Sequence, residues 1–332
     1  MGKKITISLV AYNGSAYLPY CLPSVFNQIC QDWELVILDN GSDDNSSAVI
    51  TEITGGRVNV KILPPEPKNI GFAAGHNKII KERRAEFVLL LNQDTLIEPD
   101  YIAKLMKFME NNPPVGAVSG KILRWNFKYA HKLTSNGKTD IIDTAGLRLS
   151  PSFQITDIGA GGQDNRQYDG NRAVFGVSGC LPLYRREALK QVGYFDESFF
   201  SYKEDVDLAF RLQSAGWQAW NIGSAAAYHE RKIARDESTG GFKVINRRLD
   251  RSSFANYFSY RNHLFVLIKN LSVADFVRYG IFISWYEFKK FLYILLLEQK
   301  TLYAWTEVIK RLPRLLKERQ KIKPKSVKRW IQ

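Results

Sequence analysis

A strand, a polar or glycine-rich turn and a helix recur four times within residues 5–95, and no other feature narrows the possible folds as much. The expected strands are apolar runs at residues 5–10, 33–38, 58–63 and 87–91. Uninterrupted Val, Ile and Leu runs of this length are typical of strands that are buried on both faces of a parallel sheet. The repetition therefore predicts an α/β fold with a mostly parallel, doubly wound central sheet and helices on both faces.

The turns after these strands carry polar residues or glycines, and we expect all of them at one edge of the sheet. Ligands of open α/β sheets bind at the carboxyl ends of the strands, so Asp94, just beyond the fourth strand, is where a carboxylate can meet a ligand. Gly71 and Gly75 would let the backbone approach a ligand closely, and helix N-termini at this edge would hold a diphosphate. Ordinary turn chemistry explains each turn separately, but not four turns at the same edge.

The pattern changes beyond residue 99. A helix is expected at residues 100–111 and a strand at residues 115–120. Residues 125–171 are polar and rich in turn formers, and a long irregular segment of this kind predicts binding loops or a lid.

Three acids, Glu204, Asp205 and Asp207, open a predicted helix that ends near Gly216. Acids stabilise a helix N-terminus, so capping alone explains them. Alternatively, one carboxylate faces the ligand edge as a general base while its neighbours orient it or bind the substrate. His229 follows a strand expected at residues 217–222. A lone histidine is usually structural, but one placed downstream of a carboxylate site can complete a divalent-metal shell.

Six segments, in order along the chain, carry a family resemblance. They are SLVAYN, VILDNGSDDNS, NIGFAAGHN, LLLNQDT, GVSGCLPLYRREALKQVGYFDESFFSYKEDVDLAFRLQSAGW and YHE. Together they resemble the family 2 inverting glycosyltransferases with the Rossmann-like GT-A fold, and within that family the bacterial rhamnosyltransferase-like branch. The resemblance covers about residues 4–230 and implies a nucleotide-diphosphate-sugar donor.

The resemblance also implies which residues bind the donor. The expected nucleotide-sugar residues are Ala11, Tyr12, Asn13, Asp39, Asn40, Ser42, Asn69, Gly71, Phe72, Asn77, Asn92, Gln93 and Asp94. Asp94 matches the last acid of the family's Asp-x-Asp motif and, with His229, would hold Mg²⁺ or Mn²⁺ on the diphosphate. Asn92 stands where that motif begins with an acid, so we expect weak or partial metal dependence.

Asp205 matches the catalytic base of the family's Glu-Asp-x-Asp motif, and Glu204 is the competing candidate. The base would take a proton from an acceptor hydroxyl as that oxygen attacks the anomeric carbon with inversion. The residues expected on the sugar and acceptor side are Ser178, Gly179, Cys180 and Asp207. No Gln-x-x-Arg-Trp string is present, which is unlike a processive polysaccharide synthase.

Residues 246–332 lie beyond the resemblance and predict amphipathic helices with a basic end. Residues 310–329 hold ten basic residues against Glu318 alone, in a chain of net charge +14. Such helices would lie in a membrane interface and bring the site to a lipid-linked acceptor. Alternatively, they pack on the catalytic domain or form a homodimer. No recognised nucleic-acid reader accompanies the charge, so nucleic acid is not an expected partner.

The sequence thus predicts a GT-A catalytic domain at residues 1–245 and a helical region at residues 246–332. Residues 1–95 would form the nucleotide-binding half of the domain and residues 96–245 the acceptor and catalytic half. Three cysteines without metal-ligand spacing suit a reducing compartment, and no uncharged apolar run reaches the length of a spanning helix. We therefore expect a cytoplasmic protein that is peripheral on the inner face of the cell membrane.

The resemblance implies transfer of L-rhamnose from dTDP-L-rhamnose to a polyprenyl-diphosphate-linked saccharide in bacterial cell-surface polysaccharide synthesis. A UDP-hexose or UDP-N-acetylhexosamine transferase of the same fold is the first alternative. A catalytically silent scaffold that binds a sugar nucleotide is the second.

Overall fold

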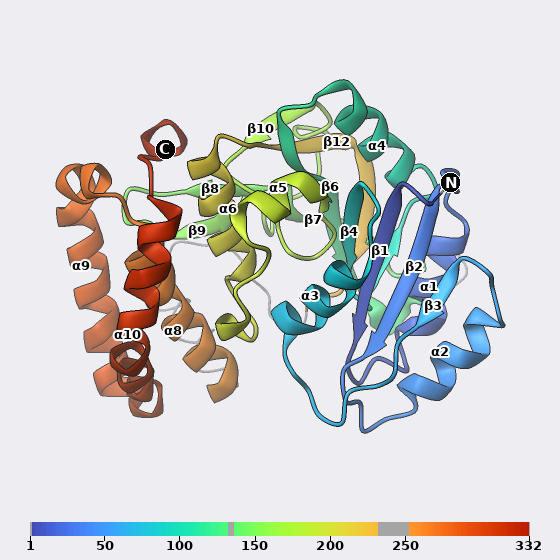
Figure 1. The fold of residues 1–332 in the computed structure, drawn as a ribbon, viewed down its shortest axis with the longest axis horizontal. Coiled ribbons are helices and arrows are strands. Elements are labelled where there is room, and N and C mark those ends of the chain that lie inside the picture. The colour runs from blue at the N-terminus through green and yellow to red at the C-terminus, as the bar shows by residue number, and fades with distance from the viewer. Residues whose placement is uncertain (1, 132–135, 232–251, 332) are drawn as a thin grey trace.

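The four strands expected in the first half are present as β1 (Ile5–Ala11), β2 (Trp33–Asp39), β3 (Val60–Ile62) and β4 (Phe87–Leu91). They pair in parallel in the order β4-β1-β2-β3. The helices α1 (Leu18–Phe26), α2 (Ser46–Thr54) and α3 (Phe72–Glu82) connect them (Figure 1). The prediction of a doubly wound α/β sheet is confirmed.

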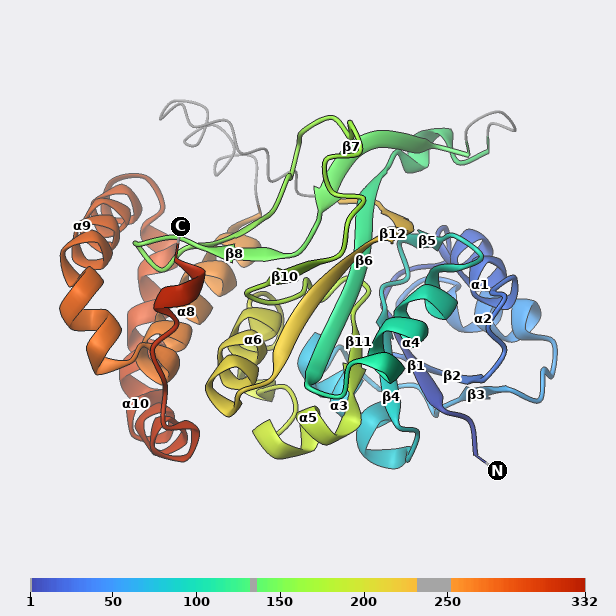
Figure 2. The same ribbon diagram turned by 90° about the horizontal axis from the view of Figure 1, so that it is seen from above.

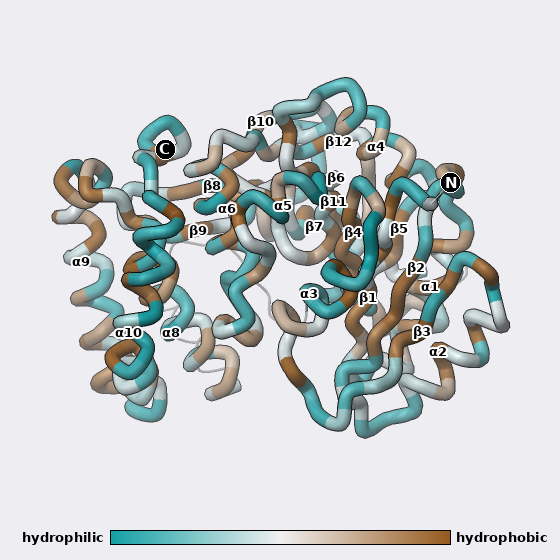
Figure 3. Tube along the Cα trace, viewed as in Figure 1, coloured by the Kyte–Doolittle hydropathy of each residue, from teal (hydrophilic) through white to brown (hydrophobic). Residues whose placement is uncertain are grey.

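Alternation along β4 explains why helices cover both faces of the sheet. Phe87, Leu89 and Leu91 pack in one core cluster with side chains of α1 and α4 (Tyr101–Asn111). Val88 and Leu90 point to the other face and pack with α3, α5 (Arg186–Val192) and α6 (Glu204–Ala215). Both faces of β4 are therefore shielded from water, which is why the strand is an uninterrupted apolar run. The hydrophobic strands are brown in Figure 3.

The computed structural model describes residues 2–131, 136–231 and 252–331, so the predicted boundary between residues 245 and 246 lies outside the described residues. In this part of the chain the main sheet has ten strands in the order β10-β12-β6-β11-β4-β1-β2-β3, with β5 beside β12 and β7 beside β6. Its second half is built on β6 (Val115–Trp125) and β12 (Gln218–His229), which pair in parallel. Both strands are longer than predicted, and β12 extends to His229.

Residues 125–171 were expected to be irregular, and this expectation is wrong in part. They contain β7 (Lys138–Thr144), β8 (Leu147–Leu149) and β9 (Ile155–Asp157), and β10 (Arg172–Val174) follows. The strands β8 and β9 form an antiparallel pair of three residues each. Strands this short do not show the alternation of apolar and polar residues by which a strand is recognised in a sequence. The remaining strands are β5 (Thr95–Ile97) and β11 (Leu183–Arg185). Short 3₁₀ helices are η1 (Phe127–Tyr129), η2 (Glu197–Phe199), η3 (Gln299–Leu302) and η4 (Lys328–Trp330).

The predicted C-terminal helical region consists of α8 (Ser253–Asn270), α9 (Val273–Leu297) and α10 (Tyr303–Ile322), which stand at the end of the sheet beyond α6 (Figures 1 and 2). The basic segment 310–329 is part of this packing and not a free tail. Arg314 lies 3.0 Å from Asp196, and Arg329 donates to Gln213 at 2.8 Å. No described helix combines the length and the apolar character needed to cross a membrane.

Candidate functional site

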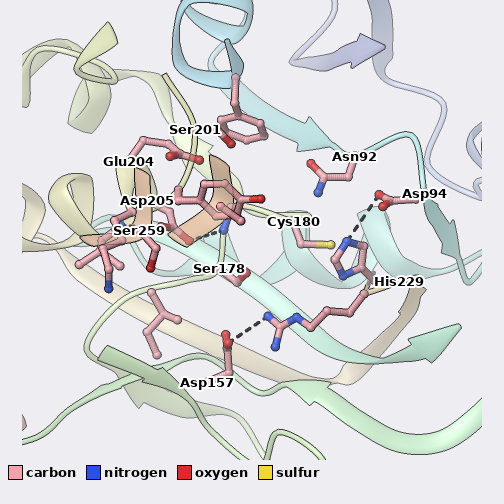
Figure 4. A pocket seen from close by; sticks show the side chains of 18 of the residues that line it. Asn92, Asp94, Asp157, Ser178, Cys180, Ser201, Glu204, Asp205, His229 and Ser259 are labelled. Atoms are coloured by element: carbon pink, nitrogen blue, oxygen red, sulfur yellow. Dashed lines mark hydrogen bonds and ion pairs between the residues drawn. The ribbon is translucent and has the colours of Figure 1, made fainter. Parts of the chain in front are cut away.

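A cavity of about 330 Å³ lies beyond the carboxyl end of β4, between the sheet, the N-terminus of α6 and α8 (Figure 4). It collects predicted residues from five segments of the chain. The predicted residues that line it are Phe72, Asn92, Asp94, Ser178, Gly179, Cys180, Glu204, Asp205 and His229. The expected donor, metal and base residues are thus partly brought together in one cavity.

Strand pairing explains how His229 reaches Asp94. Asp94 immediately precedes β5, and in the antiparallel pairing of β5 with β12 Thr95 is opposite His229. The Glu230 backbone N–H also donates to the Asp94 carbonyl at 3.0 Å. Nε2 of His229 consequently lies 3.5 Å from Oδ1 of Asp94 (Figure 4).

The other ring nitrogen of His229 has a carboxylate partner from β7. Nδ1 lies 2.9 Å from Oδ2 of the fully buried Asp143. Arg231 lies 2.9 Å from Asp143 and donates to Asp157 at 2.9 Å. Asp143 favours a proton on Nδ1, so Nε2 is the ring nitrogen that faces Asp94. Asp143 therefore fixes both the orientation and the tautomer of the ring.

This donor set fits a divalent metal. A carboxylate oxygen and an imidazole nitrogen share the cavity, and the imidazole is supported by a second carboxylate as in many metal sites. Burial lowers the pKa of the His229 imidazole, but Cys180, Asp94 and Asp143 outweigh it and raise that pKa well above its usual value. Metal binding at Nε2 would therefore displace a proton. Among the described residues no three His, Cys, Asp or Glu side chains are arranged to hold a metal, so a diphosphate and water would supply the other ligands.

Asp205 is held at the first turn of α6 by backbone donors. The N–H of Gly179 donates to Oδ2 at 2.9 Å, and the N–H of Val206 donates to Oδ1 at 2.8 Å. The turn at Gly179 therefore fixes the carboxylate at the wall of the cavity (Figure 4). A base in this position can accept a proton from a hydroxyl that enters the cavity.

Glu204, the competing base, has a different environment. Its side chain is buried, and Oε2 has no hydrogen-bond partner among the described residues. Burial, followed by the charge of Asp205, raises the pKa of Glu204 to about 8. Burial thus favours the neutral form of Glu204, whereas backbone N–H donors orient the Asp205 carboxylate, and this difference favours Asp205 as the base.

Asp207 does not lie at the cavity, although it was expected on the sugar and acceptor side. It is fully buried and forms ion pairs with Arg211 at 2.8 Å and Lys269 at 3.0 Å. One helical turn is 3.6 residues, so a residue two positions beyond Asp205 points away from the face that Asp205 occupies. Asp207 instead joins α6 to α8.

Some of the residues expected to bind the nucleotide sugar form a connected network of loop hydrogen bonds at the same sheet edge, outside the cavity. Tyr12 and Gln93 exchange two hydrogen bonds, of 2.9 and 2.8 Å. The N–H of Asn13 donates to Ser42 at 3.0 Å, and the N–H of Ser42 donates to Asp39 at 3.0 Å. Ala11 ends β1 beside this network.

Several other polar residues expected to bind the nucleotide sugar form hydrogen bonds within the protein itself. Asn40 donates to Asn69 at 3.1 Å, and Asn69 accepts from the N–H of Gly71 at 2.8 Å. Gly71 has φ +91°, and a Cβ there would lie 2.6 Å from the Phe200 carbonyl oxygen, so glycine is required. Asn77 is buried and exchanges hydrogen bonds with the Phe195 backbone, which makes it an anchor of that loop rather than a group exposed to a ligand.

Sequence reasoning missed part of the cavity. The lining residues that it did not single out are Leu147, Asp157, Ser201, Tyr202, Lys203, Val206, Glu230, Arg231, Ala255 and Ser259. Asp143, behind His229, was also missed. The three positions before Glu204 were a usable signal, because they lead directly into the acidic helix start. Asp143 and Asp157 had no signal, because their strands were not recognised.

Comparison with known proteins gives a family and a fold. The profile described as Glycosyl transferase family 2 matches residues 6–193, more than half of the chain. The poly-beta-1,6-N-acetyl-D-glucosamine synthase of Staphylococcus epidermidis is 28% identical over 208 residues, which cover 63% of this chain and 45% of that protein. The synthase of the same name from Staphylococcus aureus (strain COL) is 27% identical over 214 residues, 64% of this chain and 47% of that protein. The chain thus spans about half the length of these curated relatives.

Solved structures agree on the fold. GalNAc-T7, solved with UDP, GalNAc and Mn²⁺, is similar with a TM-score of 0.66 and 15% identity over 98% of this chain and 56% of that chain. The mannosyltransferase PcManGT from Pyrobaculum calidifontis, in complex with GDP-Man and Mn²⁺, has a TM-score of 0.54 and 17% identity over 94% of this chain and 76% of that chain. At these identities the likeness shows the shared GT-A fold.

The rhamnosyltransferase-like branch that the sequence suggested is not confirmed, since none of these relatives carries that name. The broader expectation is confirmed by the family match, the sheet topology and the C-terminal helices. The chain belongs to glycosyltransferase family 2.

Proposed function

We propose that this protein is an inverting transferase that moves one N-acetylhexosamine from a UDP-linked donor to a saccharide acceptor. One observation carries the proposal: Asp94, His229 and Asp205 line the same cavity, so a metal-binding pair and a base share one space. A scaffold that only binds a sugar nucleotide has no chemical need for a base in this position.

The donor is inferred from the relatives. The two synthases are named for N-acetyl-D-glucosamine, and the GalNAc-T7 structure contains UDP and GalNAc. The dTDP-L-rhamnose donor expected from the sequence has no counterpart among them, so UDP-N-acetylhexosamine, the first alternative, takes its place. The printed sequence contains no Gln-x-x-Arg-Trp string, so we propose transfer of single sugars rather than polymerisation.

The reaction follows from the roles of the residues. Asp205 accepts the proton of an acceptor hydroxyl as the hydroxyl oxygen forms its bond to the anomeric carbon from the face opposite the leaving group. The bond from the anomeric carbon to the diphosphate breaks, and UDP leaves with inversion. Mg²⁺ or Mn²⁺ held by Asp94 and His229 would neutralise charge on the diphosphate. Asp143 keeps His229 oriented for that task, and burial favours the protonated form of Glu204 beside the base.

Ligand-induced thermal stabilisation tests the donor. The purified protein is heated with Mg²⁺ or Mn²⁺ and a panel of UDP-GlcNAc, UDP-GalNAc, UDP-glucose, dTDP-L-rhamnose and GDP-mannose. Because a ligand that binds only the native state raises Tm, a UDP-N-acetylhexosamine should raise Tm more than UDP alone and more than the other donors. Asp94→Asn should lose the metal-dependent part of the shift, and Asp140→Asn, an exposed position on β7, should keep it. A larger shift with dTDP-L-rhamnose would overturn the donor assignment.

A further inference from the structure

The helix α9 presents an apolar face to the outside of the protein. Within this helix, which is described in full, the buried residues are Asp275, Ile283 and Ile294. Six large apolar residues follow one another at intervals of three or four and are 38% to 79% exposed: Val277, Ile281, Trp285, Phe288, Leu292 and Leu296. This spacing puts them on one helical face, which runs the length of the 25-residue helix, about 37 Å. We refer to these six residues as the α9 face.

The exposed charges of α9 are basic. Arg278 and Lys289 are exposed, whereas the acids of the helix are turned inward. Asp275 accepts from Ser326 at 2.6 Å, and Glu287 lies 2.7 Å from Nε2 of His263. The surroundings of the α9 face therefore combine apolar side chains with positive charge.

The apolar surface continues onto α10. The rings of Phe291 and Trp305 lie 6.4 Å apart, and an apolar groove of about 460 Å³ runs between the start of α9 and α10. The groove is lined by Leu267, Leu271, Phe276, Leu312 and Leu316, among others. An exposed apolar surface of this extent is unusual for a monomer and marks an interaction site.

Two partners could cover the α9 face, a second copy of the chain or a lipid surface, and the charge around the face distinguishes them. In a two-fold dimer the same patch meets itself, which would bring the basic residues of one α9 toward those of its copy. An anionic lipid surface instead complements Arg278 and Lys289 and offers acyl chains to the apolar residues. We propose that the α9 face binds the surface of an anionic phospholipid bilayer, with the helix lying along the interface.

The helix α8 links the cavity to the helix that carries the α9 face. Ala255 and Ser259 of α8 line the cavity, while His263 of the same helix contacts Glu287 of α9. A bilayer on the α9 face would be separated from the cavity by α8. That arrangement suits an acceptor anchored in the lipid, as expected from the sequence.

Co-sedimentation with vesicles tests the α9 face. The full chain, without donor, should bind vesicles of equal phosphatidylglycerol and phosphatidylcholine and should bind pure phosphatidylcholine at least tenfold more weakly. The double variant Ile281→Glu, Phe288→Glu should lose at least tenfold in binding, because it puts two carboxylates on the α9 face. Val58→Glu changes a fully exposed apolar residue on the catalytic domain and should bind like the wild type. Binding unaffected by the double variant, or a dimer that the double variant dissociates without any vesicle binding, would overturn the proposal.

A second, independent observation concerns the loop before α6. Phe200, Tyr202 and Lys203 have φ of 64°, 70° and 68°, a backbone conformation that residues other than glycine rarely adopt. Such backbone persists only where its surroundings impose it, and it is common at functional sites. This loop runs directly into Glu204 and Asp205 and supplies Tyr202 and Lys203 to the cavity wall.

The contacts that hold the loop in this backbone conformation come from α8. The side-chain amide of Asn262, which is fully buried, lies 2.7 to 2.9 Å from the carbonyl oxygens of Phe199, Ser201 and Tyr202. Arg261 donates to the Ser198 and Phe199 carbonyls at 2.7 and 3.0 Å. The geometry points to Asn262 as a positioning residue that holds this loop, and through it Asp205, in the working arrangement.

The kinetic part of the test rests on the proposed transferase activity, whereas the hydrogen-exchange part does not. A wrong activity and a wrong positioning role therefore give different results. Asn262→Ala should lower kcat at least tenfold and change the donor KM by less than about threefold, because donor residues outside the loop are untouched. Val308→Ala, which trims a buried residue of α10, is the control for lost stability and should keep kcat. Hydrogen exchange should rise in residues 198–205 of Asn262→Ala but not of Val308→Ala, whether or not the donor is correct. Equal kcat in the two variants, or unchanged exchange in Asn262→Ala, would overturn the positioning role.

Discussion

Oδ2 of Asp143 lies 2.9 Å from Nδ1 of His229, across 86 residues of sequence. This contact leaves Nε2 as the nitrogen that faces Asp94. The strand β6 pairs with β7 on one side and with β12 on the other, and so brings these two residues together. The proposed metal-binding pair, Asp94 and His229, and its supporting carboxylate Asp143 are therefore brought together by sheet topology rather than by a local motif.

Replacing Asp143 should weaken metal binding. In Asp143→Asn the carboxylate that orients His229 is lost, and substitutions of such supporting groups typically reduce metal affinity about 10–100-fold. Mn²⁺ titration in the presence of UDP measures the change. Asp140→Asn alters an exposed residue of the same strand and should titrate like the wild type. An unchanged Mn²⁺ affinity in Asp143→Asn would remove Asp143 from this role.

Glu204 should make the folded protein less stable as the pH rises. Its pKa is about 8 in the folded protein, against an ordinary value of 4.5. Between these values the folded state holds one more proton than the unfolded chain, so this contribution is fully present below about pH 4.5 and is lost as the pH rises through 8. In this window Tm should fall more steeply with pH for the wild type than for Glu204→Gln.

The control for this comparison is Glu110→Gln, which changes an exposed carboxylate paired with Lys4. It should keep the slope of the wild type. If the slopes of the wild type and Glu204→Gln coincide, Glu204 is not held protonated by its surroundings.

Lys269 should be essential for docking the C-terminal helices. It is fully buried and lies 2.6 Å from Asp196 and 3.0 Å from Asp207. Removing one member of a buried ionic cluster leaves uncompensated charge and costs about 3–5 kcal/mol. Thermal unfolding of Lys269→Ala should show a large loss of Tm. Lys4→Ala breaks an exposed pair worth about 0–1 kcal/mol and should change Tm little. Similar losses in the two variants would contradict the account.

The first half of the fold could be predicted because short-range sequence patterns determine its strands and turns. The strand Phe87–Leu91 is apolar throughout since both faces are covered, and its end is marked by Asn92 and Asp94. These features need only short-range pattern and the rule that ligands meet the carboxyl edge of a parallel sheet. The acidic helix start also indicated a base, but the family resemblance selected Asp205 and assigned the metal to Asp94 and His229.

The rest depends on contacts between distant segments. Asp143 lies on β7, which no apolar–polar alternation in the sequence indicated, and its partner His229 lies on β12. Asp207 looked equivalent to Asp205, but its partner Lys269 comes from α8, which no pattern near residue 207 reveals. Likewise, the basic segment 310–329 is amphipathic in sequence, and only the folded chain shows that Arg314 meets Asp196.

The most direct test of the central claim is UDP release from a UDP-N-acetylhexosamine by Asp205→Asn, measured over a panel of saccharide acceptors together with donor binding. The account predicts that donor binding stays within about threefold of the wild type while turnover falls about 10²–10⁴-fold, as expected for loss of a general base. Turnover equal to that of the wild type would contradict the assignment of Asp205 and of this cavity as the site of transfer.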